Sequence, residues 1–450
     1  MKMRCRPLLW LALASIQGCS FYKAETLPNA PEFPLDVAAV GAPSLSPLTA
    51  TLLPPHPFDA SDGLDITEVA TLAVLNNPDL RAARLALRVS KAQSFAAGLL
   101  PDPQINFSHD FPKMTGPGIS TAFLVGLSYS VNTLLAHSTV NAAGDNDDKQ
   151  AELNLAWQEW QTIAQSRMLF VRLKGAEARD ALLTQTRAVL ADRVDRMQRA
   201  LTQGLLSLDA VTPHLAALQD IERQVSDLRR QTNQARYELI ALLGLGPDTV
   251  LVLQDSPALP LIESTSIDLE LPALLAARPD IRALRAGYQA QDARYRAALL
   301  NQFPAFTFGV QRARDTSNAY TRGFSVNLSL PLFNGGRGDI RVQDATRDKL
   351  RADYQQRLNS GSTDVHRLLS EQAISQHQLV GVERALQTLH SARDRMREAL
   401  LAHNVDALAL ATLETATLAK ETERIDALQA LQEQRIALLT LTGNSGNLTP

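Results

Sequence analysis

Residues that commonly carry chemistry are sparse and scattered along this chain. Its eight histidines include no His-x-x-x-His pair, and only His109 lies beside a carboxylate, that of Asp110. The sequence has no glycine-rich loop followed by lysine, as in a nucleotide-binding P-loop, and no Gly-x-Ser-x-Gly turn. We therefore predict no catalytic residue, no metal site and no cofactor, and we interpret His109 as an exposed residue of a strand near an outer loop.

Three acidic residues in the last quarter of the chain could act together. Asp394, Glu398 and Asp406 lie close to a predicted turn between two helices. In an oligomer they could form inward rings of carboxylates, which favour cations and could contribute to a pore gate. The alternative is that they face solvent, as most charged residues on helices do.

Composition and charge describe an ordinary folded chain that leans towards helix. Its 450 residues are 45% hydrophobic, 20% charged and only 5% aromatic, and the chain is long enough to bury a large core. The formal net charge is −3, without a basic patch. Because nucleic-acid binding depends on clustered positive charge, we predict no nucleic-acid partner.

The first residues have the pattern of a secretory signal. Three basic residues precede an apolar run over residues 8–16, which is too short to cross a bilayer as a helix. The run ends in Ile-Gln-Gly before Cys19, which resembles a bacterial lipobox. We expect residues 1–18 to be a signal peptide and Cys19 to carry palmitate as the first mature residue, with Ser20 favouring the outer membrane. The alternative is ordinary cleavage near Ala14.

The region after Cys19 is extended and proline-rich. Residues 19–63 show little periodicity, so we expect a tether laid over the folded body. Cys5 leaves with the signal peptide, and acylation of Cys19 leaves no thiol for a disulfide. Loss of residues 1–18 also removes three positive charges and shifts the formal net charge from −3 to −6.

One unit of the sequence occurs twice, at a constant offset of 201 residues. Residues 77–107 and 278–308 are identical at eleven of 31 aligned positions. The same offset aligns residues 123–131 with residues 324–332. A single offset that holds across a helical pattern and a strand pattern indicates a duplicated supersecondary unit.

Each copy is predicted to hold a helix followed by a β-hairpin. The helix begins at Pro78 or Pro279 and runs until further prolines stop it. Hydrophobicity then alternates with a period of two, which predicts hairpins at about residues 104–131 and 304–331. The apolar parity consists of Ile105, Phe107, Phe111, Phe123, Val125, Leu127, Tyr129, Val131, Phe306, Phe308, Val310, Phe324, Val326, Leu328 and Leu330.

The opposite parity of these strands is mostly Ser, Asn, Thr and Gly. An apolar outside and a small, polar inside, over about ten residues per strand, is typical of a transmembrane β-barrel; a small β-sandwich is the alternative. Four strands cannot close a barrel, and an open edge in lipid leaves backbone groups unpaired. We therefore expect a homotrimer in which three chains contribute four strands each to a twelve-stranded barrel with a lumen.

In each copy the apolar spacing after the β-hairpin predicts a long helical hairpin. The first covers about residues 137–243 and the second about residues 338–442, and each has a short central break. Val211, Leu218 and Val225 recur at the seven-residue spacing of coiled coils. Two hairpins from each of three chains would give a ring of twelve helices; the alternative is a four-helix bundle or coiled-coil stalk without a pore.

The chain resembles the TolC-type outer membrane efflux protein family over roughly residues 64–443. The resemblance is carried by NPDLRAAR with AGLLPDP, RPDIRALRAGYQAQDARYRAAL with FPAF, SLPLFNGGRGDI, and GLLSLDAV at a helical turn. It implies a mostly α fold with a small transmembrane β part: a trimeric outer-membrane β-barrel joined to a periplasmic α-barrel. It also implies an equatorial belt from short helices near residues 66–75 and 269–277.

The same resemblance implies a function and partners. The protein would be a passive outer-membrane duct, not an enzyme, in a tripartite system with a periplasmic adaptor (membrane fusion protein) and an inner-membrane efflux pump, exporting drugs or metal ions. Adaptor-docking positions at the helical turns would be Gly204, Leu205, Leu206, Ser207, His403, Asn404, Val405 and Asp406. The second turn departs from the family's usual Gly-Leu-x-Ser form. The alternative function is a structural coiled-coil lipoprotein that tethers the outer membrane without a pore.

Together, the repeat and the resemblance give expected domain boundaries. These are a signal peptide (1–18), a lipid-anchored tether (19–63), a first repeat (64–246), a linker (247–266), a second repeat (267–443) and a C-terminal tail (444–450).

Overall fold

The computed structural model describes residues 23–31, 33, 52–53, 58–59, 61–113, 116–255, 259, 264–401 and 407–443. The chain divides into two units, Met1–Pro34 and Leu35–Pro450, and the helices and strands among the described residues belong to the second. Several predicted features lie outside the described residues: the signal peptide, Cys19, the second helical turn (His403, Asn404, Val405 and Asp406) and the C-terminal tail.

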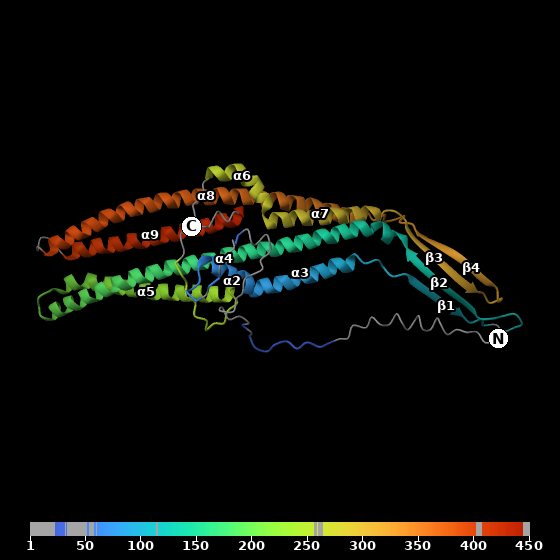
Figure 1. Ribbon diagram of the computed structural model, residues 1–450, viewed down its shortest axis with the longest axis horizontal. Helices are drawn as coiled ribbons and strands as arrows, with labels where there is room; N and C mark the ends of the chain where they lie inside the picture. The colour runs from blue at the N-terminus through green and yellow to red at the C-terminus, as the bar shows by residue number, and fades with distance from the viewer. Residues whose placement is uncertain are drawn as a thin grey trace. The chain divides into compact units, whose positions relative to one another are not determined.

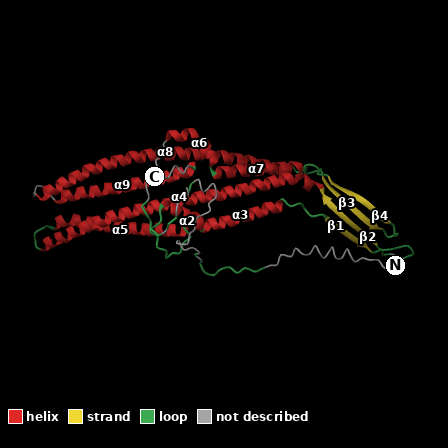
Figure 2. Cartoon of the chain, viewed as in Figure 1, coloured by secondary structure: helices red, strands yellow, loops and turns green. Residues whose placement is uncertain are grey.

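Long helices and one small sheet make up the second unit (Figures 1 and 2). The helices are α2 (Ile66–Asn76), α3 (Pro78–Ala97), α4 (Val131–Thr202), α5 (Leu208–Leu242), α6 (Ser264–Ala277), α7 (Pro279–Leu300), α8 (Arg337–Leu401) and α9 (Ala407–Thr442). The strands are β1 (Gln104–Asp110), β2 (Ala122–Ser130), β3 (Ala305–Arg314) and β4 (Tyr320–Ser329). The strands lie together at one end of the long helices, and the turn between α4 and α5 lies at the other (Figure 2).

Both copies of the repeated helix begin at a proline, as predicted. Pro78 opens α3 and Pro279 opens α7, where the missing proline N–H costs no hydrogen bond. The Asp280 carboxylate accepts two hydrogen bonds from the buried Arg278 guanidinium, at 3.0 and 2.8 Å. Arg278 also lies over the Trp157 ring, 5.1 Å from its centre. The start of α7 is thereby fixed against α4.

The four strands form one antiparallel sheet in the order β1-β2-β3-β4. The two predicted hairpins are joined side by side through β2 and β3, where Leu127 lies opposite Val310. This register places the apolar parity of all four strands on one face of the sheet. Because β1 and β4 end the order, each has one edge without a strand partner in the described chain.

Helix α4 begins at Val131, directly after β2, and not near His137 as predicted. The difference has a tertiary cause. The Asn132 side chain donates to the Pro304 carbonyl at 3.3 Å and accepts from the Phe306 amide at 2.7 Å. The first turn of α4 is therefore held to the start of β3, a contact that local helical periodicity does not contain.

The long helices pack side by side in the same order as the strands. Close to the sheet α3 packs on α4, α4 on α7 and α7 on α8 (Figure 1). Further away α5 packs on α4 and α9 on α8, and α4 contacts α9 between the two hairpins. With 72 residues, α4 extends roughly 110 Å. Helices α3 and α8 are thus outer members of the layer, as β1 and β4 are of the sheet.

The hydrophobic core is concentrated where the short helices α2 and α6 cross the long ones. From α2, Val69 and Leu72 are fully buried in a cluster with Phe170 of α4. From α6, Leu271 and Leu275 are buried against α8 and α9. Helix α6 begins earlier than the stretch at residues 269–277 that the family resemblance implied. These two clusters hold the short helices on the long ones, and their part in an equatorial belt stays a prediction.

A separate apolar seam joins α4 and α5. Val211, Leu218 and Val225 are all buried, which confirms the predicted seven-residue spacing. Val225 packs in a cluster with Leu183 of α4. In the part of the chain that the structure describes, none of the helices is apolar over a stretch long enough to cross a membrane.

Candidate functional site

The apolar face of the sheet is uncovered in the single chain. Phe107 is 70% exposed and Phe324 is 74% exposed, although both are large apolar side chains. Ile105, Phe308 and Val310 on the same face are also exposed. An exposed apolar patch of this kind marks a surface that contacts lipid or another protein.

The opposite face of the sheet is small and polar, with Leu124 as an apolar exception. Asn106 donates to the Ser128 hydroxyl at 3.5 Å across the β1–β2 pair. At Gly309 an added Cβ would lie 2.7 Å from the Ser325 hydroxyl oxygen, so this position has no room for a side chain. The two faces therefore have the contrast that the sequence predicted.

The two copies of the repeated helix are buried to very different extents. In α7, ten residues are buried, including Ile281 and Ala290. In α3, only Leu80 is buried, while Val89, the counterpart of Ala290, is 57% exposed. Helix α7 packs between α4 and α8, whereas α3 packs on α4 on one side. The outer side of α3 therefore exposes apolar residues of the kind that pack between helices, but no helix of the described chain covers them.

The first helical turn is an exposed tip. Gly204 has a φ of +71°, a conformation that suits glycine at a helix end, and the Leu205 amide donates to the Ala200 carbonyl at 2.8 Å. Leu205 is 72% exposed, and Gly204 and Ser207 are also exposed, while Leu206 is half-buried. The predicted docking residues of this turn are therefore accessible, and their role stays a prediction.

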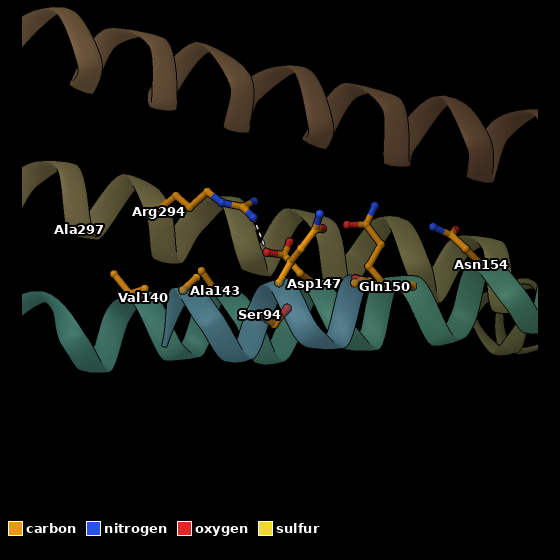
Figure 3. Close-up of a pocket in the computed structure, with 13 residues that line it drawn as sticks. Ser94, Val140, Ala143, Asp147, Gln150, Asn154, Arg294 and Ala297 are labelled. Atoms are coloured by element: carbon orange, nitrogen blue, oxygen red, sulfur yellow. Dashed lines mark hydrogen bonds and ion pairs between the residues drawn. The ribbon is translucent and has the colours of Figure 1, made fainter. Parts of the chain in front are cut away.

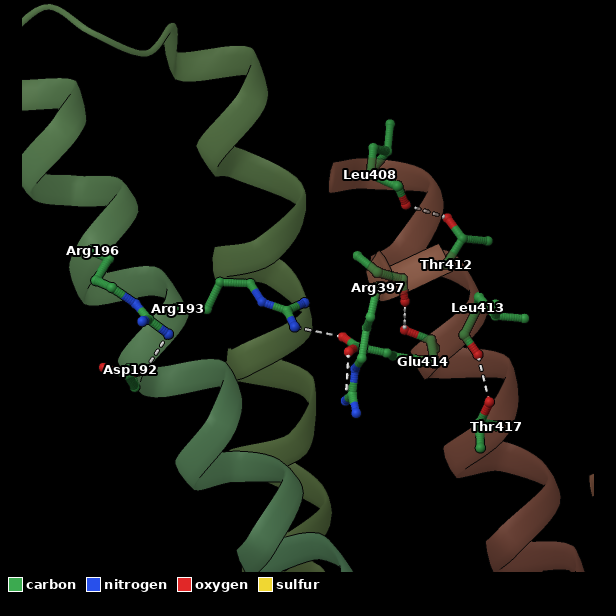
Figure 4. Close-up of polar contacts among 11 residues, drawn as sticks. Asp192, Arg193, Arg196, Arg397, Leu408, Thr412, Leu413, Glu414 and Thr417 are labelled. Atoms are coloured by element: carbon green, nitrogen blue, oxygen red, sulfur yellow. Dashed lines mark hydrogen bonds and ion pairs between the residues drawn. The ribbon is translucent and has the colours of Figure 1, made fainter. Parts of the chain in front are cut away.

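Close to the tips, one glutamate joins three helices (Figure 4). Glu414 of α9 accepts from Arg193 of α4 at 2.6 Å and from Arg397 of α8 at 3.1 Å. The Glu414 side chain is 18% exposed. In contrast, the Asp192–Arg196 pair on α4 is exposed and stays within one helix. Glu414 thus ties the first helical hairpin to the second.

Sequence reasoning did not identify Glu414, although one signal was present. It is the only charged residue between residues 407 and 419. An isolated charge in an otherwise uncharged helical stretch is expected to have a partner, because burying it alone is costly. Its partners could not be named from sequence, since Arg193 is 221 residues away.

The predicted acidic gate is only partly described. Asp394 and Glu398 are exposed on α8, and Asp394 accepts a hydrogen bond from the neighbouring Arg393 at 3.2 Å. Asp406 lies outside the described residues. The inward ring and the solvent-facing arrangement therefore both stay predictions.

A cavity of about 570 Å³ lies between α3, α4 and α7 (Figure 3). Asp147 of α4 and Arg294 of α7 form an ion pair at its wall. Burial raises the pKa of the Asp147 carboxyl above its ordinary value, while the nearby Arg294 guanidinium opposes that rise. Ser94 of α3 and Gln150 of α4 add uncharged polar groups. The wall of this cavity thus combines one ion pair with uncharged polar groups.

The described residues contain no group of three or more His, Cys, Asp or Glu side chains positioned to hold a metal ion. His109 lies edge-on to Phe111, with ring centres 4.5 Å apart, at the end of β1 far from the helices. It has the exposed position that its place in the sequence predicted.

Two described residues of the expected tether pack on the body. Leu52 and Leu53 are buried in a cluster with Trp160 and Ile163 of α4. The buried Arg167 guanidinium donates to the Leu52 carbonyl at 2.9 Å, and its burial lowers the pKa of Arg167 to about 10. This short segment is therefore held in place by both apolar and polar contacts.

Comparison with known proteins identifies the class. Residues 271–444 match the model of the outer membrane efflux protein family. The multidrug resistance outer membrane protein MdtP of Escherichia coli strain K12 is 25% identical over 278 residues, 56% of this chain and 56% of MdtP. MdtP of Shigella flexneri is 28% identical over 177 residues, 36% of this chain and 35% of the relative. The matches span about a third to about half of these relatives' lengths.

Solved structures show the same fold over nearly the whole chain. The outer-membrane channel OprN has a TM-score of 0.74 at 19% sequence identity. The match covers 96% of this chain and 100% of the OprN chain. CusC has a TM-score of 0.70 at 18% identity, covering 95% of this chain and 100% of CusC. Residues 271–444 thus carry an outer membrane efflux protein domain, and the predicted fold class is confirmed.

Proposed function

We propose that this protein is the outer-membrane channel of a tripartite efflux system, a passive homotrimeric duct for small solutes such as drugs or metal ions. The observation that carries the proposal is the open sheet. Its apolar face is exposed and both of its outer strands, β1 and β4, have a free edge in the described chain.

Closure of the sheet requires other copies of the chain. In a bilayer each unpaired backbone group costs several kcal/mol, so only closed sheets are stable there. Pairing β4 of one chain with β1 of the next in three chains gives twelve strands, which enclose a lumen lined by the small polar face. A structural tether without a pore would account for the long helices but would leave this sheet without a role.

The helical layer supports the same assembly. Helix α3 has an uncovered apolar side with Leu85 and Val89, and α8, at the opposite edge of the layer, exposes Val342 near its sheet end. In a ring of three chains α3 of one chain meets α8 of its neighbour, as β1 meets β4. The interface would then cover both sets of apolar residues at once.

The ends of the duct suit different surroundings. The sheet would lie in the outer membrane and the helices in the periplasm, with Cys19 as a lipid anchor. The tip residues from Gly204 to Ser207 would dock a periplasmic adaptor, which in turn joins an inner-membrane pump. Energy and cargo selection would belong to the pump, because a wide polar lumen selects little.

Reconstitution tests the proposal. The full-length chain, extracted from outer membranes in detergent, is expected to run as a trimer by native mass spectrometry and to conduct ions in planar lipid bilayers. A monomer that stays in plain buffer and does not conduct would overturn the proposal. A Cys19→Ala variant that still forms conducting trimers would separate anchoring from channel formation.

A further inference from the structure

Three arginines lie on the apolar face of the sheet, at the end of the strands away from the helices. The register places Arg312 of β3 directly opposite Arg322 of β4, and Arg314 opposite Tyr320. On the other side of β3, Phe123 of β2 is opposite Arg314. The apolar rows of Val310 and Phe324 lie next to them, nearer the helices. Positive charge therefore borders the apolar band on its own face.

These arginines have no acidic partner in the part of the chain that the structure describes. Asp110 lies at the same end of the sheet but on the opposite parity of β1. Asp315, in the β3–β4 turn, accepts hydrogen bonds from the backbone amides of Ser317 and Ala319 at 2.9 Å each. Like charges that face each other across a strand pair are destabilising. Arg312 and Arg322 therefore face each other, and no described carboxylate on the same face of the sheet neutralises them.

Aromatic rings hold part of this cluster on the outer face. The Arg314 guanidinium lies 5.4 Å from the centre of the Phe123 ring and 6.0 Å from that of Tyr320. Arg312 lies 6.0 Å from the same Tyr320 ring. Arg314 also donates to the Thr121 carbonyl at 2.7 Å. In Arg314 the Nε and Nη2 atoms donate to Thr121, which leaves Nη1 for an anion, and a guanidinium beside an aromatic ring keeps its remaining N–H donors.

We propose that Arg312, Arg314 and Arg322 bind the phosphate groups of a phosphorylated lipid in the outer leaflet of the outer membrane. The proposal rests on the proposed function, which sets the apolar face against lipid and the strand ends distal to the helices at the outer surface. A phosphomonoester carries close to two negative charges and three acceptor oxygens, and arginine pairs with such groups through two parallel hydrogen bonds.

A lipid fits this site better than a soluble anion. The cluster borders the exposed Phe324 and Val310 side chains, so acyl chains can cover the apolar band while the head group reaches the guanidinium groups. A free phosphate would gain only the polar half of this surface. In a trimer the site would occur three times around the barrel.

Binding of diphosphorylated lipid A to the detergent-purified trimer, measured by native mass spectrometry, tests the proposal. The triple variant Arg312→Gln, Arg314→Gln, Arg322→Gln is expected to bind at least about tenfold more weakly, because charge-assisted hydrogen bonds are lost. The matched control is Arg196→Gln, Arg223→Gln, Arg230→Gln, which removes three exposed helix charges and is expected to bind as the wild type does.

Further arms separate head group, acyl chains and protein folding. Lipid A stripped of its phosphates is expected to bind as weakly to the wild type as intact lipid A does to the triple variant, and inorganic phosphate is expected not to compete. Equal binding by wild type and triple variant, equal binding of stripped lipid, or full competition by phosphate would each overturn the proposal. If the triple variant does not assemble, Arg322→Gln alone is expected to weaken binding several-fold, and an unchanged affinity would overturn it.

The proposed function has a separate readout in this experiment. A wild-type chain that forms no conducting trimer contradicts the channel itself. A conducting trimer that does not discriminate between phosphorylated and stripped lipid A contradicts only the lipid site.

Discussion

Leu85 and Ala286 occupy equivalent positions of the repeated helix, yet Leu85 is 59% exposed and Ala286 is 5% exposed. Their environments differ because α7 packs between two helices whereas α3 is at the edge of the layer. Helix α7 therefore shows how the repeated helix is buried when it has a helix on both sides, and α3 can be compared with it. The larger, exposed side chain, Leu85, is on the helix that has a neighbour on one side only.

Acidic residues on the free side of α3 should prevent assembly. Leu85→Asp with Val89→Asp would bury two carboxylates at each chain contact, which costs several kcal/mol. The monomer should keep its helix content, since both side chains are exposed in the single chain. Native mass spectrometry and circular dichroism measure the two effects. The control Val250→Asp with Val252→Asp changes exposed apolar residues away from α3, and a similar loss of trimer in that control would contradict the assigned interface.

Glu414→Gln should loosen the contact between the two helical hairpins. The change removes the acceptor charge shared by Arg193 and Arg397, and we expect the free energy of unfolding to fall by about 1–2 kcal/mol. Since Glu414 joins helices near the tips, we also expect higher conductance in planar bilayers. Asp192→Asn, which breaks an exposed pair within α4, should change stability by less than about 0.5 kcal/mol. Unchanged conductance in Glu414→Gln would rule out a role for Glu414 in closing the tip.

Gly244→Ala should destabilise the junction between α5 and α2. Gly244 has a φ of +62°, and an added Cβ would lie 2.5 Å from the Asn76 carbonyl oxygen. Gly204 also has a positive φ, +71°, but nothing lies within 4 Å of an added Cβ. We expect about 1–2 kcal/mol of destabilisation for Gly204→Ala from backbone strain alone. For Gly244→Ala we expect about 1–3 kcal/mol more from the steric clash. Urea unfolding of both variants gives the difference, and equal losses would show that the clash is relieved.

Asp147 should make stability depend on pH in the acid range. Because burial raises the pKa of Asp147 in the folded state, the folded chain binds this proton more tightly than the unfolded chain. The resulting stabilisation is fully present below the ordinary pKa of 3.8 and is lost as pH rises through the raised folded pKa. The unfolding free energy of the wild type should therefore fall relative to that of Asp147→Asn as pH rises in this window. The exposed Asp145→Asn variant is the control, and an equal slope in both variants would contradict the assignment.

Local pattern was sufficient to predict the strands and most of the helices. Ile105 and Phe107 alternate with polar residues, and an alternation of this kind predicts a strand with one apolar and one polar face. Pro78 and Pro279 similarly mark helix starts because proline fits the first turn. The early start of α4 at Val131 was not predictable, since Asn132 is held by residues of β3 far along the chain.

The candidate sites were harder to predict because they depend on how the two copies pack. Glu414 meets Arg193 only when the two hairpins lie in register, and no local spacing contains that register. The same holds for Arg312 and Arg322, whose shared face follows from the β3–β4 pairing. The tip at Gly204, by contrast, is local, because glycine with a positive φ ends a helix wherever it packs.

The tip at Gly204 has a consequence for stoichiometry. Each chain has one described turn, Gly-Leu-Leu-Ser, and one predicted turn between α8 and α9, and the sequence of the predicted turn differs, His-Asn-Val-Asp. In a ring of three chains the turns would alternate around a pseudo-sixfold axis. A partner that recognises one kind of turn would bind in three copies, whereas a partner that tolerates both would bind in six.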